Sequence, residues 1–166
     1  MKFVQGNLLE APDQYLLQQC NCLTIRAHGL SRQISDLYPW ANPYSKRTKV
    51  GHRNLAISEN RPNPGSVHIL DHPDEYHKII CLYGQWGPGT PGKYRSYPEW
   101  EKDTYESRYI WFKSGLDCLG MNSDIKTIAI PYKIGCGLAG GNWDNYSKLL
   151  VDFEHKYNKY IVCYKL

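Results

Sequence analysis

The chain has 166 residues, of which 42% are hydrophobic and 22% charged, and its formal net charge is +4. These values predict a single globular domain over residues 1–166 and exclude an intrinsically disordered chain. The charge suits an anionic ligand; nucleic acid is a possible partner but not the expected one. No apolar run is as long as a membrane helix and no signal-peptide core is visible, so we expect a cytoplasmic monomer with no membrane partner and with reduced cysteines.

Strand and helix patterns alternate along the chain. Short apolar runs predict strands at residues 1–5, 15–20, 66–70, 78–83, 126–131 and 160–164. Apolar residues at helical spacing predict helices over residues 29–38, 105–119 and 143–157. Because there is also no internal repeat, we expect one three-layer α/β domain, with a mixed central sheet flanked by helices.

Two long segments show no sustained period. Residues 41–65 carry five Lys or Arg residues and three prolines, and residues 84–98 carry three prolines and four glycines. Both are expected to be surface loops, and loops of this length are usually functional. The basic cluster of the first segment, from Lys46 to Arg53, could contact nucleic-acid phosphates, although a solvated loop is the default interpretation. In and beside the second segment, Trp86 and Trp100 could cover a ligand or anchor the loop to the core.

A glycine-rich loop follows the predicted strand at residues 126–131. Four glycines lie between residues 135 and 141, and Asn142 is a good N-cap for the next helix. Glycines let backbone amides converge on an anion, and a helix start adds partial positive charge, so the loop predicts a pyrophosphate site. The alternative is a turn that only reverses the chain.

Two better-known phosphate loops do not fit these glycines. No Lys-Ser or Lys-Thr pair follows them, which excludes the P-loop. Gly135, Gly137 and Gly140 do spell G-x-G-x-x-G, but the dinucleotide-binding fold carries that pattern after its first strand and not near the C-terminus. Ligands of α/β sheets bind beyond the carboxyl ends of strands, so residues 21–29, 84–97 and 135–141 are the candidates to line the site.

Four segments carry the most specific residues, namely Gln5-Gly6-Asn7-Leu8-Leu9, Gln18-Gln19-Cys20-Asn21-Cys22, Ala27-His28-Gly29-Leu30 and Ile134-Gly135-Cys136-Gly137-Leu138-Ala139-Gly140-Gly141. Together they resemble the macro domain family, in its opening motif, its "VNxxN" strand end and its two glycine-rich phosphate loops. The last segment is similar to the branch described as ADP-ribose 1″-phosphate processing proteins, and to the branch that removes ADP-ribose from acidic side chains or DNA bases. The resemblance covers nearly the whole chain and implies a macro fold with an ADP-ribose binding cleft.

The resemblance also implies roles for single residues. Asn21 would orient the hydroxyls of the distal ribose, although a turn asparagine bonded to its own backbone is the alternative. The adenine would lie near Asn7 and Leu8, where Asn7 replaces the family's usual aspartate. The two loops that would wrap the diphosphate and its ribose consist of Ala27, Gly29, Leu30, Gly135, Cys136, Gly137, Leu138, Ala139 and Gly140. No cofactor is implied, and the expected partner is ADP-ribose or an ADP-ribosylated substrate.

The catalytic group is the least determined part of the site. Hydrolases of the related branch use a lysine after the central strand and an aspartate in the second loop, whereas this chain has Tyr83-Gly84-Gln85-Trp86 and Ala139 there. A covalent mechanism based on lysine is therefore not expected. His28 could take a proton from an attacking water, with Asp144 as a second candidate. The expected activity is hydrolysis at the distal ribose, of ADP-ribose 1″-phosphate or of an ADP-ribosyl conjugate; the alternative is a non-catalytic reader of ADP-ribosylated partners.

Two further patterns invite a chemical interpretation. Cys20 and Cys22 with His28 could suggest zinc, but their spacing matches no common site, and no metal is expected. Cys136 lies between glycines near a helix start and could be an activated thiolate. The resemblance instead makes Cys136 a loop residue whose backbone matters more than its sulfur.

Overall fold

The computed structural model describes all 166 residues. Its six strands are β1 (Lys2–Gln5), β2 (Tyr15–Asn21), β3 (Val67–Leu70), β4 (Lys78–Gln85), β5 (Thr127–Pro131) and β6 (Tyr160–Lys165). Its α-helices are α1 (Leu30–Leu37), α2 (Tyr105–Gly120) and α3 (Trp143–Tyr157). Four short 3₁₀ helices complete it: η1 (Leu8–Glu10), η2 (Pro39–Ala41), η3 (Ser58–Asn60) and η4 (Trp100–Lys102).

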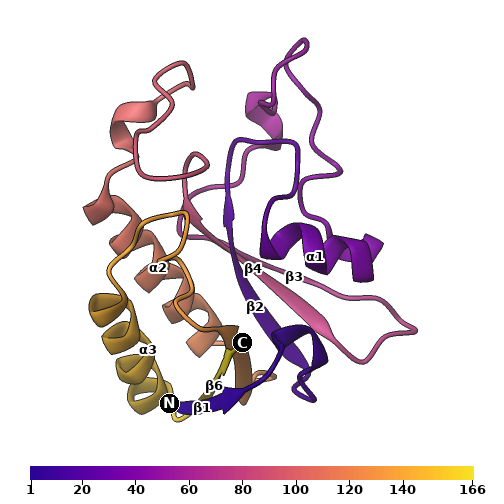
Figure 1. Cartoon of the computed structure of the whole chain (residues 1–166), viewed down its shortest axis with the longest axis vertical. Helices are drawn as coiled ribbons and strands as arrows, with labels where there is room; N and C mark the ends of the chain where they lie inside the picture. Colours follow the sequence, from indigo (N-terminus) through magenta and orange to yellow (C-terminus); the bar gives the residue numbers. More distant parts are fainter.

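The six strands form one mixed sheet in the order β1-β6-β5-β2-β4-β3. Every neighbouring pair is parallel except β3 and β4, which are antiparallel. Helices α2 and α3 cover one face and α1 covers the other (Figure 1). This arrangement confirms the expected three-layer α/β fold with a mixed central sheet.

The alternation of side chains along the strands explains why the sheet has two cores. Successive residues of a strand point to opposite faces. Accordingly, Leu17 packs with the side chains of α2 and α3, whereas Leu16 packs with Ile34 of α1, and all three side chains are fully buried. Because both faces are covered, the central strands are almost entirely apolar, as expected for parallel strands.

Local signals placed most element boundaries within one or two residues. The Asn142 side chain caps α3 as predicted, accepting a hydrogen bond from the backbone N–H of Asn145 at 3.1 Å. The predictions were short at two strand ends, because β2 continues to Asn21 and β4 to Gln85. Gly84 and Gln85 therefore lie in a strand, and not in the loop to which the sequence assigned them. None of the helices is long and apolar enough to cross a membrane.

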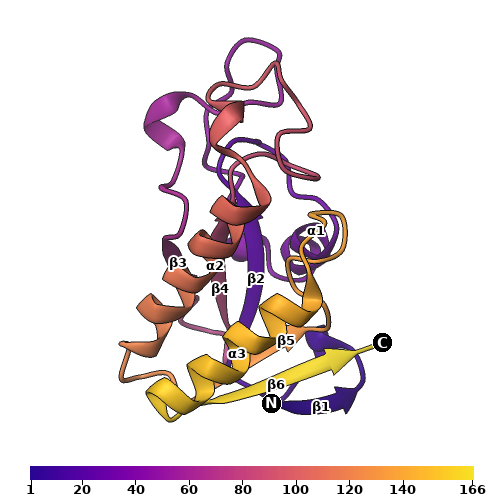
Figure 2. The ribbon, with the colours of Figure 1, turned by 90° about the vertical axis from the view of Figure 1, so that its left-hand side faces the viewer.

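The two long loops lie side by side at one end of the molecule (Figures 1 and 2). Arg53 donates to the carbonyl of Ser96 at 2.9 Å, and the Tyr97 hydroxyl donates to the carbonyl of Asn54 at 3.0 Å. The segment at residues 41–65 is not a simple surface loop, because several of its side chains are buried, namely Ala41, Tyr44, Arg47, Leu55 and Ala56.

Candidate functional site

A cleft of about 320 Å³ lies at the carboxyl ends of β2, β4 and β5. Asn21, Gln85 and Pro131, at or near the last positions of these strands, all line it. Its two walls are the turn that leads into α1 together with the first residues of that helix, at residues 28–31, and the loop that follows β5, at residues 132–139. We call these the first and second cleft loops.

The lining includes most of the site residues that the sequence suggested: Asn21, His28, Gly29, Leu30, Gly135, Gly137, Leu138 and Ala139. The other suggested residues lie outside it: Asn7, Leu8, Ala27, Cys136 and Gly140. Asn7 caps η1, accepting from the backbone N–H of Leu9 at 3.0 Å, and Leu8 is buried in the core. Gly140 lines a separate hollow behind the second cleft loop.

The Asn21 side chain is held in a tight turn at the end of β2. Its Oδ1 accepts from the backbone N–H of Leu23 at 3.0 Å and of Thr24 at 2.8 Å, and the Thr24 hydroxyl lies 3.1 Å from the same oxygen. Nδ2 lies 3.0 Å from that hydroxyl. Asn21 thus makes the local bonds of a turn asparagine and also lines the cleft, with 8% of its surface exposed.

The second cleft loop leaves a row of backbone donors unused. Just after the loop, Gly140 N–H donates to the carbonyl of Gly137, and Gly141 N–H to the carbonyl of Gly135, both at 3.0 Å. The amides of Gly137, Leu138 and Ala139 donate to no group of the protein. Gly135 has a φ of +73°, in the left-handed region that favours glycine, and this turns the chain into the row. Successive free amides of this kind bind anions.

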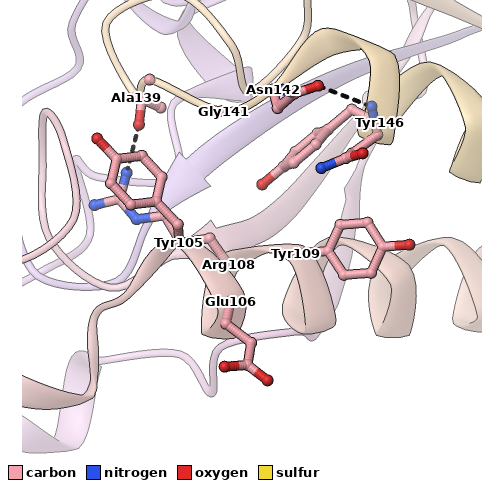
Figure 3. Close-up of a pocket in the computed structure, with 10 residues that line it drawn as sticks. Tyr105, Glu106, Arg108, Tyr109, Ala139, Gly141, Asn142 and Tyr146 are labelled. Atoms are coloured by element: carbon pink, nitrogen blue, oxygen red, sulfur yellow. Dashed lines mark hydrogen bonds between the residues drawn. The ribbon is translucent and has the colours of Figure 1, made fainter.

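A buried arginine behind the second cleft loop fixes its position (Figure 3). Arg108 donates to the carbonyl of Ala139 at 3.3 Å and to that of Gly89 at 2.7 Å. Its Nε and Nη2 bind the two oxygens of Asp103 at 2.7 and 2.8 Å, a bidentate ion pair. Asp103 also accepts from the backbone N–H of Gly87 at 3.0 Å. Arg108 thereby ties the second cleft loop to the long loop that follows β4.

A second buried arginine supports the turn at the end of β2. Arg47 donates from Nη1 to the carbonyl of Thr24 at 2.8 Å and from Nη2 to the carbonyl of Asn21 at 3.0 Å. Its guanidinium carbon lies 4.6 Å from the ring centre of Tyr44, whose hydroxyl accepts from the backbone N–H of Asn21. Arg47 is only 9% exposed and forms no ion pair. The sequence placed it wrongly, as part of a solvated basic loop.

Comparison with known proteins agrees with this architecture. The sequence matches no protein-family model. The macrodomain of DarG from Thermus aquaticus superposes with a TM-score of 0.68, at 20% identity, over 99% of this chain and 97% of that one. The macrodomain of Mycobacterium tuberculosis DarG gives a TM-score of 0.64, also at 20% identity, over 98% and 95% of the two chains. The protein has a macrodomain fold.

A sequence relative accompanies these structures. It is a protein of Enterobacteria phage T4, named as the uncharacterized 17.5 kDa protein in the tk-vs intergenic region, which is 26% identical over 168 residues. The match covers 98% of this chain and 95% of the phage protein. The match is thus end to end in sequence, as the superpositions on the two DarG macrodomains are in structure.

Few groups in the cleft of this macrodomain fold can exchange a proton. The lining contains no Asp or Glu, and its titratable side chains are His28, Tyr44, Tyr132 and Lys133. His28 is exposed and makes no hydrogen bond within the protein, so its ring is free to meet a ligand or a water. Burial holds the pKa of Tyr44 well above its usual range, which leaves its hydroxyl protonated. Asp144 is exposed in the first turn of α3 and does not line the cleft.

Two glutamines occupy the floor where β2 and β4 end. Gln19 Nε2 donates to Gln85 Oε1 at 2.8 Å, and Gln85 Nε2 donates to the carbonyl of Gly87 at 2.9 Å. The buried Oε1 of Gln19 has no partner. This oxygen lies 2.9 Å from where a Cβ on Gly135 would stand, so it packs directly against the second cleft loop. No motif in the sequence marked these two glutamines as a pair.

The remaining alternatives can be judged from burial. Cys20 and Cys22 are buried while His28 is exposed, and no group of three metal-binding side chains forms. Burial raises the pKa of the Cys136 thiol to about 11, the opposite of what an activated thiolate requires.

Trp86 is buried and donates to the carbonyl of Pro98 at 2.8 Å, so it anchors its loop and does not cover the cleft. Trp100 also lies outside the lining.

Proposed function

We propose that the cleft binds ADP-ribose, or the ADP-ribosyl group of a conjugate, and that the protein hydrolyses a bond at the distal ribose. The observation that carries this proposal is the row of free amides at Gly137, Leu138 and Ala139, which faces a cleft without carboxylates in a macrodomain fold. A diphosphate supplies the acceptor oxygens and negative charge that such a row stabilises.

The same groups suggest how the ligand lies. With the diphosphate on the second cleft loop, the distal ribose would reach Asn21 and His28, where the turn leaves part of the Asn21 Nδ2 group free to donate. The adenine would extend past Pro131 towards η1, which packs against β5. There the Nδ2 group of Asn7, whose Oδ1 already accepts from Leu9, can donate to a ring nitrogen.

The proposed chemistry is direct attack by water. The His28 ring takes a proton from the water, and the water oxygen forms the new bond at the distal ribose or its 1″-phosphorus. Attack at C1″ of the distal ribose breaks the C–O bond, and the carboxylate or phosphate departs with its electron pair. Attack at the 1″-phosphorus breaks the P–O bond instead, and the ribose 1″-oxygen departs with the electron pair and takes up the proton held by the His28 ring. Gln85 and Ala139 cannot act as nucleophile, acid or base, so no covalent intermediate forms on them. The loop amides stabilise the diphosphate throughout.

The first test is calorimetric titration of ADP-ribose into the protein, with AMP and NAD as comparison ligands. Binding in the micromolar range that prefers ADP-ribose supports the cleft assignment. Absence of binding at millimolar ADP-ribose would remove the basis of the proposal.

The role of His28 is tested by His28→Ala, with His52→Ala as the matched control because His52 is also exposed but does not line the cleft. Loss of a general base typically costs about 10²–10⁴-fold in turnover. We expect that loss for His28→Ala with ADP-ribose affinity retained, and no change for His52→Ala. Equal loss of binding and turnover would instead assign His28 to ligand binding.

The second candidate is a reader that binds ADP-ribosylated partners without turnover. It is favoured by the absence of a lysine from the segment Tyr83-Gly84-Gln85-Trp86 and by Ala139, which stand where the family resemblance places a catalytic lysine and aspartate. Tight ADP-ribose binding by the unmodified protein, with no hydrolysis of ADP-ribose 1″-phosphate or of an aspartyl conjugate, would select the reader.

A further inference from the structure

A second hollow, of about 410 Å³, lies beneath the long segment at residues 41–65, beside the edge strand β3. Its walls come from residues 40, 42, 43, 46 and 47, from residues 59–63 and from β3, and the buried ring of Tyr83 also lines it. None of these residues lines the cleft described above. We call this hollow the edge pocket.

The edge pocket is positively charged. Lys46, Arg47 and Arg61 line it, and Glu59 is the single carboxylate among the lining residues. None of the three cations forms an ion pair with a carboxylate of the protein. A buried guanidinium without a counter-ion costs free energy, so the uncompensated charge of Arg47 favours an anion nearby.

The hydrogen-bonding groups left over in the edge pocket are mostly donors. Asn42 Oδ1 accepts from the backbone N–H of Tyr44 and Asn60 Oδ1 from that of Thr48, so both side chains have NH₂ groups to spare. Arg61 uses only Nε, which donates to the carbonyl of Ala56 at 2.9 Å, and both Nη groups remain. An excess of donors over acceptors matches a ligand with several acceptor oxygens and negative charge.

We propose that the edge pocket is a phosphate-binding site, separate from the cleft. Lys46 and Arg61 would bind the phosphate oxygens directly, with Asn42 and Asn60 as neutral donors and Arg47 as the buried charge behind them. Bidentate geometry suits the guanidinium of Arg61 to this task. The phosphate can be a free ion or a phosphodiester of a nucleic-acid strand, because both present the same oxygens.

Only part of the basic cluster from Lys46 to Arg53 lines the edge pocket. Lys46 and Arg47 line the edge pocket, whereas Lys49, His52 and Arg53 do not. Arg53 is instead bonded to the carbonyl of Ser96 in the neighbouring loop. Lys49 is therefore a matched control, since it lies on the same segment as Lys46, is also exposed and carries the same charge.

The experiment is an NMR titration of ¹⁵N-labelled protein, at constant ionic strength, with two probes in separate arms. One probe is inorganic phosphate, and the other is hexathymidylate without terminal phosphates. Saturable shifts of the Trp40 indole and of the Asn60 side-chain amide would report the edge pocket, whereas shifts of Gly137 to Ala139 would report the cleft. Saturation by inorganic phosphate identifies a free ion as sufficient; saturation by the oligonucleotide alone identifies a phosphodiester.

Variants decide whether the shifts reflect a site. Lys46→Ala combined with Arg61→Gln should weaken the edge-pocket response by about tenfold or more, because two charge-assisted contacts are lost. Lys46→Glu alone, at an exposed side chain without hydrogen bonds, should weaken it without affecting folding. Lys49→Ala should leave it within about twofold, allowing for screened long-range attraction. Absence of a saturable shift with both probes, or equal weakening by Lys49→Ala, would overturn the proposal.

Discussion

Arg47 and Arg108 each hold one side of the cleft, but only Arg108 has a counter-ion. Arg47 donates to the carbonyls of Asn21 and Thr24 and stacks on Tyr44, without any carboxylate. Arg108 donates to the carbonyl of Ala139 and is paired with the buried Asp103. Both are buried arginines that bind main-chain carbonyls, so the difference lies in the counter-ion.

The presence or absence of a counter-ion determines how each arginine stabilises its side of the cleft. An ion pair that is buried and fully hydrogen-bonded keeps its geometry but becomes costly when one partner is removed. A lone guanidinium held by carbonyls and an aromatic ring keeps its positive charge available to its surroundings. The second cleft loop is therefore held by a buried ion pair whose charges balance. The turn at Asn21 is held by an unpaired positive charge that still favours an anion.

Removal of Arg108 should produce the largest effect. Arg108→Met leaves the Asp103 carboxylate buried without its counter-ion, which should lower the free energy of unfolding by about 3–5 kcal/mol. Urea denaturation followed by tryptophan fluorescence would measure it. The double variant Arg108→Met, Asp103→Leu should recover much of the loss, because the stranded charge is gone. A loss below about 1 kcal/mol for the single variant would contradict the interpretation that the Arg108–Asp103 ion pair holds the second cleft loop.

Removal of Arg47 should cost less. Arg47→Met strands two carbonyls but also removes a buried charge that has no counter-ion, so we expect a loss of about 1–3 kcal/mol. The control is Lys46→Met, next to it in the sequence but exposed and unpaired, which should change stability by less than about 0.5 kcal/mol. If Arg47→Met cost as much as Arg108→Met, the proposed difference between the two arginines would be wrong.

The fold and part of the site were predictable because their signals are local. Apolar periodicity gave the strands and helices, and the Asn142 cap and the glycine spacing gave the second cleft loop. The positive φ of Gly135 and Gly140 explains why glycine stands there. These features depend on a few consecutive residues, which a sequence shows directly.

The contacts of the two arginines could not be predicted, because their partners lie far away in the sequence. Arg47 binds carbonyls 23 and 26 residues away, and Arg108 binds one 31 residues away. A main-chain carbonyl is present at every residue, so no residue type marks the acceptor in advance. Gln85 also has a partner that is distant in the sequence, because it meets Gln19 only through the pairing of β2 with β4.

Two glycine substitutions in the second cleft loop would test how rigidly this wall of the cleft is held. A Cβ at Gly135 would stand 2.8 Å from Cε2 of Tyr146 and meet a positive φ, whereas a Cβ at Gly137 meets nothing within 4 Å. Gly135→Ala should therefore cost about 1–3 kcal/mol. Gly137→Ala should stay within about 0.5–1 kcal/mol and serves as the control in the same denaturation experiment. Equal effects would mean that the wall adjusts, and that Arg108 does not fix it.

The smallest expected effect concerns Cys136, in the wall that Arg108 holds. Burial raises its pKa to about 11 from the usual 9.0. The unfolded chain releases this proton first, so the stabilising contribution is complete below pH 9 and is lost as the pH rises towards 11. Urea midpoints at pH 7.5, 9 and 10.5 should fall with pH, and fall less in Cys136→Ala.

The same shift should make Cys136 a slow nucleophile, because the thiolate is the reactive form. At pH 7.5, iodoacetamide should modify the exposed Cys118 well before Cys136, and mass spectrometry of tryptic peptides can follow both. Arg108→Met should accelerate modification of Cys136 if the ion pair keeps that wall closed. Rapid alkylation of Cys136 in the unmodified protein would show that the wall opens freely, and the two arginines would then no longer differ in how firmly they hold the cleft.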